Sequence, residues 1–140
     1  MKSTAGILIV FAALLGAPAA QAARTAPLVN LENMPVESID GKPLTLAQVR
    51  KAIISGATSR KWTPSERGPN KLYLTVSGLH AKYTATVEVS YTTKSYSIKY
   101  VDSTELSYGA GKDGKPVIHQ NYNNWVKSLQ QAINLALRTV

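Results

Sequence analysis

Two stretches of the chain place apolar residues at the spacing of an α-helix. The first is predicted over residues 45–58, where Thr45 and Gln48 form a T-x-x-Q capping box at the helix start. The second is predicted over residues 121–139, with Asn121 as its candidate cap. Its broad apolar stripe consists of Tyr122, Trp125, Val126, Leu129, Ile133, Ala136 and Leu137. Each helix therefore has one face to bury.

Strict alternation of apolar and polar residues predicts three strands between these helices, at 72–77, 83–91 and 95–100. We place the turn of the last hairpin at Thr93 and Lys94. This register pairs Tyr91 with Tyr96, Val89 with Ile98, Val87 with Tyr100 and Glu88 with Lys99. A slip by one residue would mispair all of them, because side chains alternate between the two faces of a strand.

A sheet with one apolar face needs a cover, and each helix supplies one apolar stripe. The sequence therefore predicts a two-layer α+β fold, with two helices packed on one face of an antiparallel sheet, in the order α-β-β-β-α. The sheet has three strands, or four if a short strand forms near Trp62. Residues 102–119, rich in Gly and Lys, are predicted to be a long loop. The polar face of the sheet, expected to face water, carries Thr75, Thr84, Thr86, Glu88 and Lys99.

Residues 1–22 have the features of a secretory signal peptide. An uncharged apolar run at 5–15 follows a basic residue, and Ala20 and Ala22 supply the small-x-small pattern that signal peptidase needs. We expect cleavage after Ala22. The alternative is an uncleaved membrane anchor, although the run is short for a span. After cleavage, no second apolar run that could form a transmembrane segment remains.

Beyond the signal peptide we expect an extended leader at 23–43, which three prolines keep from being helical, and a single α+β domain at 44–140. Cleavage removes Lys2, so the net charge of +8 becomes +7. A chain without cysteine excludes a disulfide scaffold, a CxxC redox site and a Cys nucleophile. It also excludes a lipid anchor on a cysteine. We therefore predict a periplasmic protein that is not lipidated.

The Gly-rich segment at 109–115 matches G-x-G-x-x-G and the start of a P-loop. Pro116 stands where a P-loop needs Ser or Thr, and it also prevents a helix from starting there. We therefore predict a flexible loop and no nucleotide cofactor. The basic residues are scattered along the chain, so the net charge favours an anionic envelope component or a periplasmic protein as partner over nucleic acid.

The candidates for catalytic chemistry are few. His80 and His119 are the only imidazoles, and no carboxylates cluster with them, so no metal site is predicted. A hydrolytic set can be assembled only from His119 with Ser103 and Asp102. We expect His119 to cap or orient the second helix rather than to act in catalysis.

The candidates for binding are four residues near the long loop and the last helix: Tyr100, Tyr122, Asn123 and Trp125. An aromatic cluster of this kind can line a ligand groove. It more often belongs to the core, with its hydroxyls reaching the rim. Asn123, together with Asp102, Ser103 and His119, either pins the loop to the helix start or forms a small polar site. We favour the structural role for all of them.

The second half of the chain carries an ordered pattern, "YSIxYxDSxxL" from Tyr96 to Leu106 and "IHxxYNxWVxxL" from Ile118 to Leu129, with Tyr108 between them. It resembles a family of uncharacterised small periplasmic proteins and lipoproteins of Gram-negative bacteria. The resemblance covers residues 83–133. It implies a periplasmic location and an α+β fold, and it implies no activity. Many members carry the cysteine of a lipoprotein, which this chain lacks.

Two hypotheses follow for function. The first is a non-enzymatic binding or envelope-associated module that uses the polar sheet face or the 102–119 loop. It is favoured by the basic charge and by the missing catalytic constellation. The alternative is a small hydrolase or small-ligand-binding protein that uses a polar site near His119. A structure distinguishes them by showing whether His119 meets Ser103 and Asp102 in one cavity.

Overall fold

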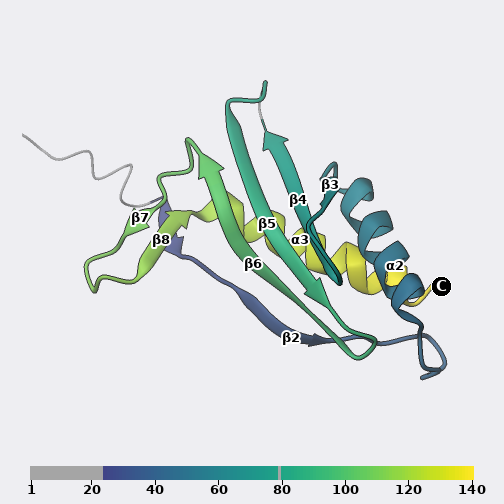
Figure 1. Ribbon diagram of the computed structural model, residues 1–140. Coiled ribbons are helices and arrows are strands. Elements are labelled where there is room, and N and C mark those ends of the chain that lie inside the picture. Colours follow the sequence, from purple (N-terminus) through teal and green to yellow (C-terminus); the bar gives the residue numbers. More distant parts are fainter. Residues whose placement is uncertain (1–23, 79) are drawn as a thin grey trace, which may run out of the picture.

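The computed structural model describes residues 24–78 and 80–140. The predicted signal peptide and its cleavage point lie outside these residues. The described part contains the following elements (Figure 1): β1 (Thr25–Pro27), β2 (Leu31–Pro35), α2 (Leu46–Ser59), β3 (Thr63–Glu66), β4 (Lys71–Gly78), β5 (Tyr83–Tyr91), β6 (Ser95–Thr104), β7 (Gly109–Ala110), β8 (Pro116–His119) and α3 (Gln120–Leu137). Neither α2 nor α3 is long and apolar enough to cross a membrane.

The strands form two antiparallel sheets. The larger has five strands in the order β2-β6-β5-β4-β3, and the smaller has three in the order β1-β8-β7. The hairpin of β5 and β6 has the predicted register, with Tyr91 opposite Tyr96 and Glu88 opposite Lys99. The predicted strand near Trp62 is β3, which pairs with β4. In Figure 1, α3 crosses behind the larger sheet and α2 lies beside it, next to β3.

The α+β class is confirmed, but the sheet of three to four strands and the α-β-β-β-α order are wrong. Two strands, β1 and β2, come from residues 23–43, and β7 and β8 come from the predicted loop at 102–119. None of these four strands has more than five residues, so none shows a readable alternation. Their pairing depends on contacts between distant parts of the chain, which local periodicity does not report.

The starts of both helices follow the rules of capping. Thr45 and Gln48 form the predicted capping box at α2, each side chain bonding the other residue's backbone N–H. At α3, the cap is His119, whose Nδ1 accepts a hydrogen bond from the backbone N–H of Asn121. The prediction of Asn121 as the cap is therefore wrong by two positions, and the expectation that His119 caps this helix is confirmed.

One core joins the two helices to the inner face of the larger sheet. Gly56 in α2 makes the closest contact between the helices. A Cβ at this position would lie 2.7 Å from the backbone N of Ile133 and 2.9 Å from the carbonyl carbon of Ala132. The missing side chain therefore sets how closely α2 approaches α3.

Tyr96 connects β6 to α3. Its ring is buried, and its hydroxyl donates a hydrogen bond of 2.5 Å to Oδ1 of Asn134. Burial raises the pKa of Tyr96 to about 12, because the phenolate would lose its hydration inside the core. The core thus holds a phenol that must stay protonated.

We predict that Gly56→Ala destabilises the protein by about 2 kcal/mol or more, in the range of overpacked cores, because the new methyl group meets backbone that cannot rotate away. Chemical denaturation measures this change. Gly109→Ala is the matched control, since its Cβ would meet nothing within 4 Å. Equal stability of the two variants would contradict the close helix contact.

We also predict that stability falls as pH rises above 10. The pKa of Tyr96 is about 12 in the folded protein and 10.0 in the unfolded chain, so between these values only the folded state keeps the proton. The stabilisation from this phenol is complete below pH 10 and is lost towards pH 12, by about 3 kcal/mol in all. Tyr96→Phe should be less stable at pH 8 yet show a shallower alkaline decline in urea denaturation.

Candidate functional site

The segment between β6 and β7 has a strained backbone. Glu105 and Ser107 both adopt left-handed backbone angles, with φ of 58° and 54°. Residues other than glycine rarely adopt these angles, and such strain persists only where the surroundings hold it. Leu106 supplies that hold, because its side chain is buried in the core and its carbonyl accepts a 2.7 Å hydrogen bond from the N–H of His119. We call residues 105–107 the strained wall.

Two hollows share the residues of this wall in their linings. The first, which we call the Tyr108 hollow, has a volume of about 580 Å³. Its other lining residues are Tyr100, Val101, Asp102, Ser103 and Tyr108. The second, which we call the His119 hollow, has a volume of about 560 Å³. Its other lining residues are Arg24, Gly78, Lys82, Tyr83, His119, Gln120, Asn121 and Trp125.

In the Tyr108 hollow, two tyrosine rings stack and two hydroxyl groups are hydrogen-bonded to each other. The rings of Tyr100 and Tyr108 stack with centroids 4.3 Å apart. The Tyr100 hydroxyl and the Ser103 hydroxyl share a 2.7 Å hydrogen bond. Partial burial raises the pKa of Tyr100, and the nearby carboxylate of Asp102 adds to this rise while the bond to Ser103 opposes it. Ser103 is thus paired with a phenol rather than with an imidazole.

Tyr122 lies beneath this hollow rather than in it. Its ring is buried and meets Tyr100 edge to face, with centroids 5.6 Å apart. Burial, followed by the proximity of Tyr100, raises the pKa of Tyr122 well above its usual range. Tyr122 therefore supports Tyr100 from the core and offers no group to a ligand.

The His119 hollow has a cationic lining. Arg24 precedes β1, Lys82 precedes β5, and His119 ends β8. Glu105 is the carboxylate of this lining. Because His119 Nδ1 accepts the cap hydrogen bond, its neutral ring carries the proton on Nε2. His119 therefore brings an N–H donor to a hollow that already holds a guanidinium and an ammonium group.

Two aromatic side chains form the apolar part of the same lining. The Lys82 ammonium lies 5.5 Å from the centroid of the Tyr83 ring. The Trp125 indole packs on the end of β4, where a Cβ on Gly78 would lie 3.2 Å from it. A side chain at position 78 would require the indole to shift slightly. The hollow thus combines positive charge with two partly buried aromatic rings.

Residues 24–35, which we call the N-terminal arm, are held by strand pairing with β8 and β6 and by side-chain hydrogen bonds. Asn123 in α3 donates from Nδ2 to the carbonyl of Pro27 at 2.8 Å and accepts from the N–H of Val29 at 3.2 Å. Beyond the arm's β1, the N–H of Leu28 bonds the carbonyl of Pro116. Asn123 thus bonds the arm backbone through the same kinds of group that a neighbouring strand would use. The arm places Arg24 in the lining of the His119 hollow.

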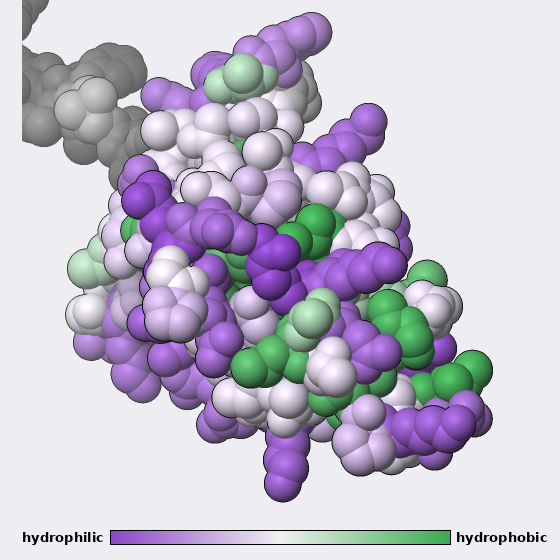
Figure 2. All heavy atoms as spheres, turned by 45° about the vertical axis from the view of Figure 1, so that its right-hand side comes forward, coloured by the Kyte–Doolittle hydropathy of each residue, from purple (hydrophilic) through white to green (hydrophobic). Residues whose placement is uncertain are grey.

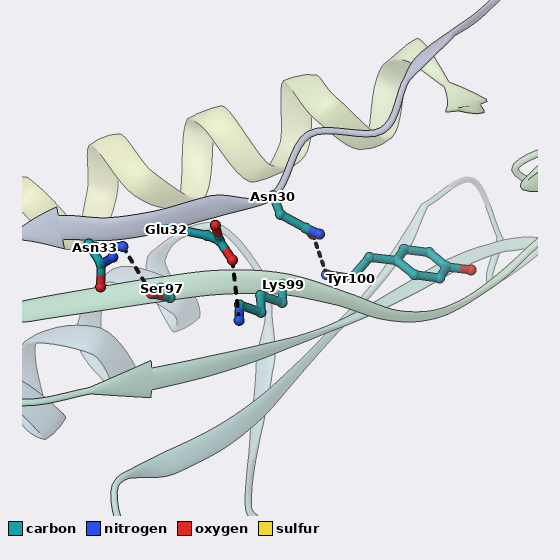
Figure 3. A network of polar contacts seen from close by, with 6 residues as sticks. All are labelled: Asn30, Glu32, Asn33, Ser97, Lys99 and Tyr100. Atoms are coloured by element: carbon teal, nitrogen blue, oxygen red, sulfur yellow. Dashed lines mark hydrogen bonds and ion pairs between the residues drawn. The ribbon is translucent and has the colours of Figure 1, made fainter. Parts of the chain in front are cut away.

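The second half of the arm is bound to β6 in the same way (Figure 3). Asn30 Oδ1 accepts a hydrogen bond from the N–H of Tyr100, and the N–H of Asn33 bonds the Ser97 hydroxyl. Glu32 and Lys99 add an exposed ion pair of 3.3 Å. The register of β2 on β6 is irregular between Leu31 and Met34, and these side-chain contacts bridge the irregularity.

The structure divides the candidates predicted from sequence between the two hollows. Ser103, Asp102 and Tyr100 line the Tyr108 hollow, whereas His119 and Trp125 line the His119 hollow. Asn123 lines neither in the described structure and holds the arm instead.

Arg24, Lys82, Tyr83 and Glu105 were missed by the sequence analysis. No local signal singles out Arg24, because it reaches the hollow only through the pairing of Thr25 with His119 across the length of the chain. In residues 24–78 and 80–140, no group of three or more His, Asp or Glu side chains could hold a metal ion.

Comparisons of the chain with models of protein families, with curated proteins and with solved structures found no match. The resemblance to small periplasmic proteins therefore stays a prediction. The function of the two hollows must be inferred from their own geometry and chemistry.

We predict that Asn123→Ala frees the arm without unfolding the protein, because it removes both side-chain bonds to the arm backbone. The amide of Val29 should exchange with deuterium at least tenfold faster, which corresponds to about 1.4 kcal/mol of lost local stability. Asn124→Ala is the control, since this neighbouring side chain is exposed. Unchanged exchange at Val29 would show that Asn123 does not hold the arm.

Proposed function

We propose that the protein is a non-enzymatic binding module of the periplasm, and that it binds an anionic group of the cell envelope in the His119 hollow. The observation that carries this proposal is the composition of the lining, in which Arg24, Lys82 and His119 border a space of about 560 Å³. Phosphate and carboxylate oxygens accept charge-assisted hydrogen bonds from such donors.

The aromatic rings narrow the ligand class. Tyr83 and Trp125 offer apolar surface beside the cations, so the ligand combines an anionic group with a flat or apolar portion. A phosphorylated or carboxylated component of the envelope has this chemistry. Arg24 and Lys82 outnumber the carboxylate of Glu105, so the lining keeps one net positive charge.

The start of α3 also favours a negatively charged ligand. The first turn of this helix carries no acidic residue, so the partial positive charge of the helix N-terminus is not neutralised there. Gln120 and Asn121 from this turn are part of the lining. The helix dipole thus adds to the side-chain cations.

The hydrolase alternative has less support. His119 lines one hollow, while Ser103 and Asp102 line the other. The Ser103 hydroxyl is bonded to Tyr100, and His119 Nδ1 is engaged in the helix cap. A nucleophile needs its base within hydrogen-bond reach, so we favour binding over hydrolysis. The periplasmic location and the cleavage after Ala22 are part of the proposal.

We predict that phenyl phosphate binds the His119 hollow and changes the fluorescence of Trp125. The other tryptophan, Trp62, is only 2% exposed, so the response reports mainly on the hollow. Lys82→Gln should weaken binding about two- to fivefold, as expected for the loss of about 0.5–1 kcal/mol in a solvent-exposed charge pair. Isothermal titration calorimetry provides a second measure of affinity.

Two controls accompany this titration. Phenol has the ring without the charge and should bind more weakly than phenyl phosphate. Lys112→Gln removes a cation that lies outside the hollow and should leave the affinity unchanged. If Lys82→Gln and Lys112→Gln bind phenyl phosphate equally well, or if phenyl phosphate does not bind at all, the proposal is wrong.

A further inference from the structure

The far end of α3 exposes apolar side chains. Large hydrophobic residues are normally covered, yet four are exposed at this end: Ile39 at 72%, Leu46 at 40%, Leu135 at 65% and Val140 at 39%. Figure 2 brings the side of α2 and the C-terminal end forward, and hydrophobic residues gather towards the lower right, interspersed with hydrophilic ones. We call the surface formed by these four residues the apolar end.

Contacts between three segments bring the apolar end together. Val140 lines a shallow hollow with Gln48 and Lys51, so the C-terminal residues lie against the first turns of α2. Arg138 forms an ion pair of 3.8 Å with Glu37, which ties the loop before α2 to the end of α3. The loop containing Ile39, the start of α2 and the end of α3 therefore share one end of the molecule.

The charges around the apolar end leave a small positive excess, because two ion pairs cancel and Lys42 and Lys51 remain against Asp40. Lys42, Lys51 and Arg138 are exposed there, and Arg50 in α2 pairs with Glu66 of β3. The acidic residues are Glu37, which Arg138 neutralises, and Asp40. Aliphatic side chains interspersed with basic ones are the pattern of proteins that lie on an anionic membrane surface.

The chemistry of this surface fits lipid better than protein. Protein interfaces are centred on aromatic anchors such as Tyr and Trp. The exposed large hydrophobic residues at this end are all aliphatic, and the exposed aromatic of the described chain, Tyr108, lies beside the strained wall. Separate aliphatic side chains can each enter the headgroup region without a complementary pocket, whereas a protein partner would need to supply one.

We propose that the apolar end docks the protein reversibly on an anionic bilayer. Ile39, Leu46, Leu135 and Val140 enter the headgroup region, and Lys42 and Lys51 contact lipid phosphates. This surface is distinct from the His119 hollow, because the two lie at opposite ends of α3, a helix of 18 residues and therefore about 27 Å long. The docked protein would present the hollow away from the membrane.

Sedimentation with lipid vesicles tests this docking. The protein is purified after secretion, and mass spectrometry verifies that every variant has the same N-terminus, so any difference between variants reports on the apolar end. We expect binding to vesicles of phosphatidylethanolamine with phosphatidylglycerol, weak binding to phosphatidylcholine, and loss of binding as salt rises. Binding that is equal on both vesicle types, or absent from both, would overturn the proposal.

Two sets of variants locate the contact. The double variant Ile39→Ser with Leu135→Ser should lower the partition coefficient at least tenfold, and Lys42→Gln and Lys51→Gln about fivefold each. The controls are Val101→Ser, an exposed aliphatic residue elsewhere, and Lys115→Gln in the β7–β8 turn. Equal losses in the controls would overturn the proposal. So would a dimer that Leu135→Ser dissociates, because a second copy would then cover this surface.

The outcome is independent of the proposed function. The double variant should still bind phenyl phosphate with unchanged affinity, and Lys82→Gln should still sediment with anionic vesicles. If vesicle binding depends on Lys82 instead of Lys42 and Lys51, the lipid headgroup occupies the His119 hollow, and the docking surface is refuted while the hollow is supported.

Discussion

The backbone N–H groups at the start of α3 have no partner within the helix, and satisfying them organises the functional half of the molecule. The N–H of His119, just before the helix, bonds Leu106, the N–H of Gln120 bonds the carbonyl of Arg24, and the N–H of Asn121 bonds the His119 ring. These three bonds join the helix to the strained wall, to the N-terminal arm and to its own cap. The His119 hollow forms where those segments meet.

The sequence predicted those parts of the fold that local patterns determine. The hairpin of β5 and β6 is long and alternates strictly, and its turn at Thr93 and Lys94 sets a register that both apolar and charged pairs support. The capping box at Thr45 is equally local, since its two side chains lie three residues apart. Such features require no knowledge of the rest of the chain.

The remaining strands and the site depend on contacts between distant segments. The arm is placed by Asn123, almost a hundred residues further along the chain, and by the pairing of Thr25 with His119. Nothing near Arg24 in the sequence indicates that it lines a hollow. The sequence marked Asp102, Ser103, His119 and Asn123 as one polar group at the loop. It could not show that Asp102 and Ser103 line one hollow, that His119 lines another, and that Asn123 bonds the arm.

The irregular edges of the larger sheet have a consequence for how the protein behaves at high concentration. An exposed sheet edge is a template on which other chains can add strands and aggregate. Here the outer strands are β2, which ends in Pro35 and bends at the left-handed Asn33, and β3, which contains Pro64. Proline lacks the N–H that a further strand would need. The irregularity of β2, which hides it from sequence periodicity, therefore also hinders the addition of further strands at this edge of the sheet.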